Sequence, residues 1–193
     1  MSTKPKIAII IGSTRAARFA DKPAAWLLKQ AQARTDMTAE LVDLRDFDLP
    51  MFDEPAPVAM KPSENPKVMA FAKTISGFDG FIFVTPEYNR SIPASLKNAI
   101  DSIYAPWVRK PFTAFGYGSM GGAFAIQHLR NIGVAVQMVP VSSMVMLGGA
   151  DFFRVGPWGS EPLEAAEGAL LPAATAAFDD LIWWAKATMA ARG

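Results

Sequence analysis

A stretch of seven residues, Pro86 to Ile92, has the side chains of a ligand-binding loop. It carries no hydrophobic period, although a continuous apolar run, Phe81–Val84, precedes it and a helical spacing of apolar residues begins after it. Residues that do not fill a core are free to contact a ligand, and this loop offers polar and aromatic groups. The candidate binding residues in it are Pro86, Glu87, Tyr88, Asn89 and Ser91.

A second loop, Gly12–Arg18, has the composition of a phosphate site. It is small and hydroxylated, carries two guanidinium groups, and ends where a helix is expected to begin. Backbone N–H groups and the helix dipole favour an anion there, the hydroxyls of Ser13 and Thr14 can donate to it, and Arg15 offers a planar fork to phosphate oxygens. The prediction includes Arg18, and the alternative is an ordinary helix cap with two arginines in solvent.

A third loop, Gly116–Gly122, matches the pattern G-x-G-x-x-G before a helix. The dinucleotide fingerprint belongs on the first strand of its unit with an acidic residue about 20 positions later, and Val136–Met138 occupies that region here. We therefore predict that the missing Cβ atoms let the backbone approach a flat ring closely. The alternative is that packing requires the glycines. The candidate residues are Gly116, Tyr117, Gly118 and Ser119.

The three loops need a scaffold that brings them together, and the alternating apolar patterns supply one. We expect strands at Lys6–Ile11, Ala39–Asp43, Gly80–Thr85, Phe112–Tyr117 and Val134–Val139, and helices at Phe19–Arg34, Asn65–Ser76, Pro93–Ile103, Gly122–Asn131 and Leu163–Ala190. This alternation predicts a parallel sheet with helices on both faces. Five strands favour a flavodoxin-like three-layer sandwich of order 2-1-3-4-5, in which the loops after strands one, three and four meet. A single domain over residues 1–193 is expected.

The composition narrows the partners to small molecules. Lysine and arginine number 19 and aspartate and glutamate 18, so no charge excess points to nucleic acid or an anionic membrane. The absence of cysteine and a single histidine, His128, leave too few ligands for a zinc site. The apolar run Ile7–Ile11 is too short for a signal-peptide core, and no run approaches the roughly 18 apolar residues of a membrane span. The expectation is a cytoplasmic protein that binds no membrane.

No acid–base pair stands out among the titratable residues. His128 is expected on a helix surface or in an interface rather than as a catalytic base, since no neighbouring spacing suggests a triad. Glu87 and Asp101 could resemble paired carboxylates, but nothing in their spacing fixes a common reacting point.

Together the three loops resemble those of the NADPH-dependent FMN reductase family, whose members include quinone, azo-dye and chromate reductases of flavodoxin-like fold. The resemblance rests on Gly12–Arg15, on Thr85–Asn89 with Ser91–Pro93 and Leu96–Asp101, and on Gly116–Gly122 running into His128–Arg130. It implies that Ser13 and Arg15 bind the FMN phosphate, with further contacts from Arg18 or backbone amides, and that the other two loops hold the isoalloxazine ring. Arg90 and Phe124 depart from residues frequent in the family, which bears on the choice of acceptor.

The resemblance implies an oxidoreductase in which FMN takes a hydride from NADPH or NADH and passes electrons to a quinone, free flavin, azo compound or similar small acceptor, in ping-pong order. The alternatives are a flavodoxin-type electron carrier, which would be strongly acidic, and a non-enzymatic flavin-binding module. The resemblance also implies a homodimer or a dimer of dimers. The expected pairing surface brings Ile100, Ile103 and Tyr104 together with Phe124, His128 and Leu129.

Overall fold

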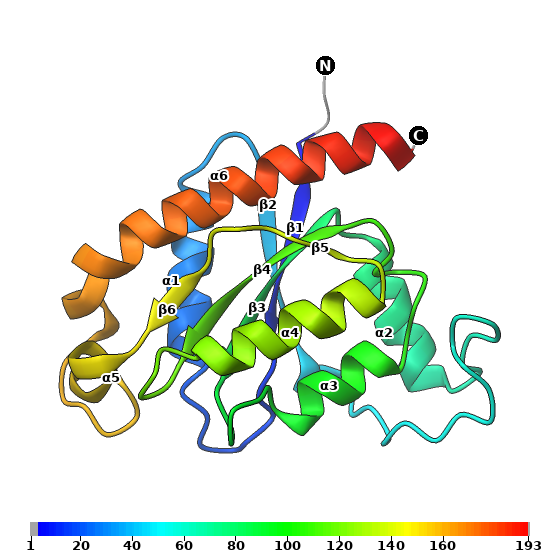
Figure 1. The fold of residues 1–193 in the computed structure, drawn as a ribbon, viewed down its shortest axis with the longest axis horizontal. Coiled ribbons are helices and arrows are strands. Elements are labelled where there is room, and N and C mark those ends of the chain that lie inside the picture. Colours follow the sequence, from blue (N-terminus) through cyan, green and yellow to red (C-terminus); the bar gives the residue numbers. More distant parts are fainter. Residues whose placement is uncertain (1–3, 193) are drawn as a thin grey trace.

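A parallel β-sheet runs through the middle of the molecule, whose residues 4–192 are described by a computed structural model (Figure 1). Its strands are β1 (Lys6–Ile11), β2 (Thr38–Asp43), β3 (Gly80–Pro86), β4 (Pro111–Tyr117), β5 (Val139–Pro140) and β6 (Val145–Leu147). The order is β2-β1-β3-β4-β5, and β6 pairs with β4 beside β5. The flavodoxin-like order is therefore confirmed, and the sixth strand is an addition to it.

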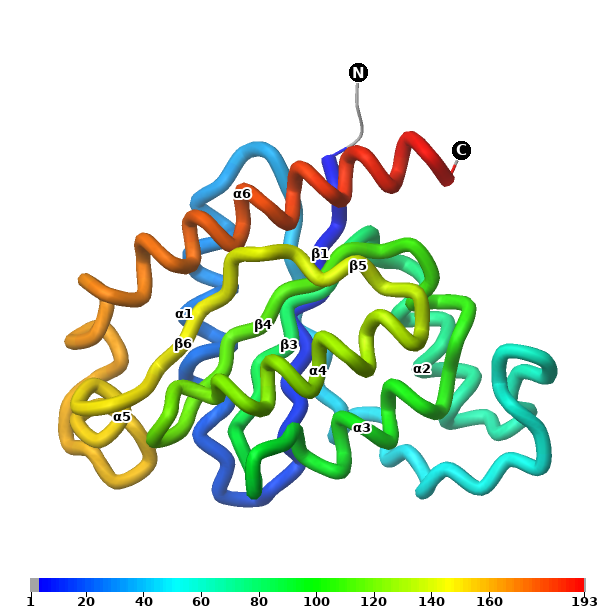
Figure 2. Tube along the Cα trace, viewed as in Figure 1, coloured from blue at the N-terminus to red at the C-terminus, as the bar shows by residue number. Residues whose placement is uncertain are grey.

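Helices cover both faces of the sheet and complete a three-layer sandwich. They are α1 (Asp21–Gln32), α2 (Pro66–Ser76), α3 (Ala94–Asp101), α4 (Ala123–Ala135), α5 (Gly149–Val155) and α6 (Glu167–Arg192). Successive strand residues point to opposite faces, so Ile9 packs in the cluster with α1 and α6, whereas Ile10 packs in the cluster with α2, α3 and α4. The trace in Figure 2 shows α6 spanning most of the width of the molecule.

The fifth strand was expected at Val134–Val139, and this prediction was wrong. The helix α4 continues through Ala135, and Gln137 then turns the chain with a φ of 60°. Only the short β5 remains to pair with β4. Beyond it the chain leaves the ladder, the hydroxyl of Thr113 donates to the carbonyl of Ser143 at 2.6 Å, and β6 then rejoins β4.

The stretch Gly148–Pro162 contains four glycines and two prolines, yet it includes the helix α5. The closing helix starts with a 3-10 turn at Leu163–Ala166 before α6 begins. Among residues 4–192, no helix combines the length and the apolar character that a membrane span requires.

Candidate active site

A cleft of about 500 Å³ opens where β1, β3 and β4 end. All three predicted loops contribute to its wall, through Arg15, Pro86, Glu87, Tyr88, Tyr117, Gly118 and Ser119. Ser13, Thr14, Arg18, Asn89, Ser91 and Gly116 are not part of this lining, and the structure places them beside or beneath it. The parallel sheet explains the meeting, because the carboxyl ends of its strands lie at one edge.

The loop after β1 presents its backbone amides. Arg45 donates hydrogen bonds to the carbonyls of Thr14, Arg15 and Ala16, so these oxygens are held on one side of the loop. Within the described chain, the N–H groups of residues 13–17 donate to no other residue. Amides with no protein acceptor, next to the exposed guanidinium of Arg15, are the components of an anion site.

Arg18 has a different position from the one expected for a phosphate ligand. Its side chain is 3% exposed, and its guanidinium donates to the carboxylates of Asp21 and Asp43 and to the carbonyl of Ser13. Burial opposes ionisation of Asp43, but hydrogen bonds from Arg18 and from the backbone N–H of Arg45 hold its pKa below the usual range. The guanidinium of Arg18 is thus occupied by protein groups and fixes the loop from below.

Ser13 and Thr14 point away from one another. Ser13 is fully buried, and its hydroxyl lies 3.3 Å from the hydroxyl of Tyr88, which also accepts from Arg15 at 3.4 Å. Thr14 instead lines a separate hollow of about 440 Å³ with Arg45, Ser95 and five other residues. Tyr88 therefore links the first and second loops through its hydroxyl.

The second loop closes as a tight hairpin. The backbone of Tyr88 and that of Ser91 exchange hydrogen bonds of 2.9 and 3.1 Å, and the two residues between them, Asn89 and Arg90, have φ values of 52° and 68°. Two successive positive φ angles define the turn that suits a two-residue hairpin. Asn89 is exposed at the tip, so only Pro86 to Tyr88 face the cleft.

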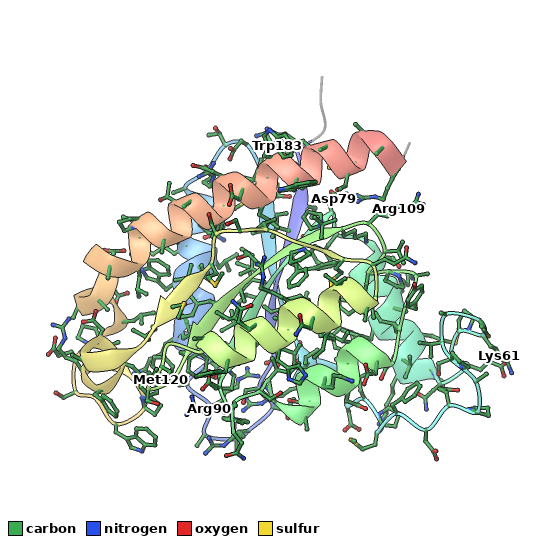
Figure 3. All side chains as sticks on the ribbon, viewed as in Figure 1. Lys61, Asp79, Arg90, Arg109, Met120 and Trp183 are labelled. Atoms are coloured by element: carbon green, nitrogen blue, oxygen red, sulfur yellow. The ribbon has the colours of Figure 1, made fainter. Side chains whose placement is uncertain are left out.

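This hairpin rests on the first turns of α4. The guanidinium of Arg90 lies 4.2 Å from the ring centre of Phe124, and the hydroxyl of Ser91 lies 2.7 Å from Nδ1 of His128. Phe124 and His128 are four residues apart and share one face of the helix. The two departures noted in the sequence, Arg90 and Phe124, are therefore contacting partners. Figure 3 labels Arg90 and Met120 at this edge of the molecule.

Glu87 caps α4 from a different segment. The helix begins after Gly122, which has no capping side chain, and the carboxylate of Glu87 accepts from the N–H groups of Phe124 and Ala125 at 2.9 and 3.3 Å. Asp101 pairs with Lys97 at 2.6 Å. The two carboxylates thus have separate structural partners, and the structure gives no reason to treat them as an acid–base pair.

The third loop uses its glycines in two ways. A Cβ on Gly122, whose φ is 75°, would lie 2.8 Å from the Cα of Gly116, so packing requires a glycine there. Gly118 also needs glycine, for its φ of 151°, but a Cβ there would meet nothing closer than 3.6 Å. Gly118 lines the cleft, and its missing side chain leaves backbone exposed to a ligand.

Six lining residues were missed from the sequence: Ala17 and five that are aromatic or proline. Phe152, Phe153, Pro157 and Trp158 come from α5 and the turn after it, and Phe19 comes from the start of α1. Phe19 packs edge-on against Tyr117, with ring centres 5.3 Å apart. Burial raises the pKa of Tyr117 well above its ordinary value, and nearby Tyr88 raises it further, so this phenol stays neutral. The available signal was a glycine- and proline-rich stretch that contains three aromatic side chains.

The cleft combines the components of an anion site with a largely apolar space. Among residues 4–192 there is no group of three or more histidine, aspartate or glutamate side chains placed to hold a metal ion. The amides of residues 13–17 with Arg15 can bind a phosphate, while Pro86–Tyr88 and Tyr117–Ser119 can flank a planar ring system.

Comparisons with known proteins all identify reductases or oxidoreductases as similar to this chain. The sequence model of a family described as NADPH-dependent FMN reductase matches residues 5–151. An NAD(P)H-dependent FMN reductase of Schizosaccharomyces pombe is 37% identical over 147 residues, which is 74% of this chain and 72% of that protein. A quinone reductase of Escherichia coli is 33% identical over 170 residues, which is 85% of this chain and 88% of that protein. FerB, a flavoenzyme NAD(P)H:(acceptor) oxidoreductase of Paracoccus denitrificans, has a similar structure, with a TM-score of 0.65, 27% identity, and coverage of 95% of this chain and 98% of that one.

Proposed function

The chain belongs to the NADPH-dependent FMN reductase family, and on that premise we propose that its cleft reduces a quinone or a similar small aromatic acceptor. It is an oxidoreductase with FMN as cofactor and NAD(P)H as electron donor. Over one cycle, NAD(P)H and a proton reduce a quinone to a hydroquinone, and FMN when bound carries the two electrons between them.

The observation that supports this proposal most is the group of free amides at residues 13–17. They lie beside Arg15 and adjoin a cleft large enough for a planar ligand, at about 500 Å³. A phosphate accepts several hydrogen bonds at once, and charge-assisted bonds are the strong ones. These residues fit a phosphorylated flavin, with Arg15 and the amides binding the phosphate and Arg18 holding the loop in place.

The ring contacts follow from the other two loops. Residues Pro86–Tyr88 and Tyr117–Ser119 line the cleft, and Gly118 leaves room for close approach. We assign these segments to orientation of the flavin ring and to exclusion of water from it. Tyr88 acts as a wall of the cleft, and its hydroxyl positions Arg15.

We propose a ping-pong order, because donor and acceptor would use the same cleft. Donor and acceptor must both reach the reactive ring, and the three loops and α5 border one cleft. If they use it in turn, double-reciprocal plots at several acceptor concentrations give parallel lines. Intersecting lines would contradict this part of the proposal.

The competing function is that of a flavodoxin-type electron carrier. Such carriers are strongly acidic, whereas this chain has a formal net charge of +1. A carrier or a non-enzymatic flavin module would bind FMN without oxidising NADPH. Steady consumption of NADPH that depends on added quinone separates the enzyme from both alternatives.

We also propose that the protein forms a dimer and that it is located in the cytoplasm. Of the expected pairing surface, Ile100, Ile103 and Leu129 are buried in the core at 0, 5 and 0% exposure, so they cannot form it. Phe124 and Val134 on α4 remain exposed, at 44 and 59%, and support pairing of two copies through the outer face of that helix. Light scattering measures the mass directly, and a stable monomer would contradict the dimer.

A cytoplasmic location is proposed because NAD(P)H, the required donor, is held inside cells.

A further inference from the structure

Trp158 is a large apolar side chain held in an exposed position at the mouth of the cleft. It is 82% exposed, lines the cleft with Phe153 and Pro157, and meets Phe152 edge-on with ring centres 6.4 Å apart. This segment lies beyond residue 151, where the match to the family ends. We propose that Trp158 is a specificity-determining residue, against which the ring of an uncharged aromatic acceptor stacks; this inference rests on the proposed function.

The segment that carries Trp158 is fastened at its base. Arg154 donates to the carboxylates of Asp151 and Glu161 at 2.9 and 3.0 Å, and to the carbonyl of Ala165 at 2.9 Å. Its own carbonyl accepts from the N–H of Glu161 at 3.2 Å. One guanidinium thus joins the start of α5, the end of the turn and the following 3-10 turn, so the loop is closed below the tryptophan.

Two glycines on either side of Trp158 tighten the turn. A Cβ on Gly156 would clash with the carbonyl of Phe152, and one on Gly159 would clash with the carbonyl of Arg154. The N–H of Gly159 donates to the carbonyl of Gly156 at 3.1 Å. The backbone therefore packs closely on α5 and presents the indole outward instead of letting it fold into the core.

The charged residues around Trp158 favour the acceptor over the dinucleotide donor as the molecule that stacks on its indole. Between residues 149 and 166 the chain carries Asp151, Glu161 and Glu164 against the single cation Arg154, which already contacts two of these carboxylates. Such a surface disfavours the phosphates of a dinucleotide. It accepts an uncharged planar ring, which gains from stacking on an aromatic face without needing a counter-ion.

The test compares Trp158→Ala and Trp158→Phe with Trp183→Ala in the FMN-loaded protein. Trp183 is also exposed, at 64%, but lies on α6 away from the cleft, so it is a matched control (Figure 3). Three readouts are needed: the KM for an uncharged naphthoquinone, kcat/KM for ferricyanide, which has no aromatic ring, and the rate at which NADPH bleaches the bound flavin.

We expect Trp158→Ala to raise the naphthoquinone KM about three- to tenfold, the range measured for aromatic pairs. The ferricyanide kcat/KM and the bleaching rate should stay within about twofold of the wild type, Trp158→Phe should recover most of the loss, and Trp183→Ala should resemble the wild type. An unchanged naphthoquinone KM, an equal loss with both acceptors, or slower bleaching would overturn the inference. Failure of the wild-type protein to bleach with NADPH would instead overturn the proposed function.

Discussion

Arg18 and Asp43 form a two-point ion pair beneath the loop that follows β1, with Nη1 of the arginine 2.7 Å from one carboxylate oxygen. Arg18 belongs to the loop and Asp43 ends β2, so the pair joins two segments that are 25 residues apart. The Arg18 side chain is almost completely buried. The pair therefore fixes the shape of the loop within the protein, and leaves Arg15 as the guanidinium that faces the cleft.

Arg18→Ala should destabilise the protein even without its cofactor. The substitution leaves Asp43 partly buried without its cation, and we expect the free energy of unfolding of the apoprotein to fall by about 2–3 kcal/mol in urea titrations. Arg15→Ala is the control, because Arg15 is exposed and its loss should change apoprotein stability by less than about 0.5 kcal/mol. If Arg18→Ala lost FMN affinity while the apoprotein stayed as stable as the wild type, Arg18 would contact the phosphate directly.

Arg15→Ala should weaken FMN binding about ten- to a hundredfold, because a hydrogen bond to a charged group contributes about 1.5–3 kcal/mol. Riboflavin, which has no phosphate, should bind the variant and the wild type equally. Fluorescence titration of the apoprotein with both flavins measures this. Arg109→Ala is a matched control, since Arg109 is exposed at the opposite end of the molecule (Figure 3). An FMN affinity within about twofold of the wild type would mean that the amides of residues 13–17 bind the phosphate alone.

Glu87→Ala should act through α4 rather than through chemistry. The carboxylate accepts from the N–H groups of Phe124 and Ala125, so its loss removes a helix cap and should lower the free energy of unfolding by about 1–2 kcal/mol. Glu87→Gln keeps an acceptor oxygen and should recover at least half of that loss. With FMN bound, NADPH should still bleach both variants. A drop of more than about a hundredfold in the bleaching rate would show that the carboxylate takes part in the reaction.

Lys110 should make stability depend on alkaline pH. It is 8% exposed, with Nζ donating to the last carbonyls of α2, and burial, followed by repulsion from Arg192, lowers its pKa to about 8. The unfolded chain keeps its proton up to about pH 10.4. Between these values the unfolded state binds more protons, so the contribution of Lys110 to stability rises with pH; below pH 8 the full cost of burying the charge remains.

The measurement compares the wild type with Lys110→Met, which removes the charge but keeps an apolar stem. From pH 7 to pH 9.5 the wild type should gain about 1–2 kcal/mol of unfolding free energy relative to the variant. Lys61→Met is the control, because Lys61 is exposed and its substitution should show no such trend. A wild-type advantage that shrinks as the pH rises would mean that the helix carbonyls raise the pKa of Lys110 instead.

The sheet order and the three loops could be predicted because local patterns encode them. The run Phe81–Val84 is buried throughout and lies within β3, and of the polar residues after it Glu87 and Tyr88 reach the cleft. The prediction of the fifth strand was wrong, and the reason is also local. Val134–Val139 is apolar enough for a strand, but the helix pattern of α4 runs into it, and the chain turns only at Gln137.

The features of the site that the sequence did not reveal arise from contacts between distant residues. Nothing in the loop sequence shows that the guanidinium of Arg18 donates to Asp43, or that the carboxylate of Glu87 caps α4. Trp158 was visible only as an aromatic residue in an irregular stretch, since its place at the cleft depends on how α5 packs beside Phe19. Residue propensities and the spacing of residues in the sequence carry no information about such contacts.

The most direct test mixes the FMN-loaded protein with one equivalent of NADPH in the absence of oxygen, and follows the visible absorbance of the flavin. We predict that the absorbance bleaches fully, and that one equivalent of quinone added afterwards restores it with formation of one equivalent of hydroquinone. A flavin that binds but stays oxidised in NADPH would rule out the proposed reductase activity, and would identify the protein as a carrier or a binding module.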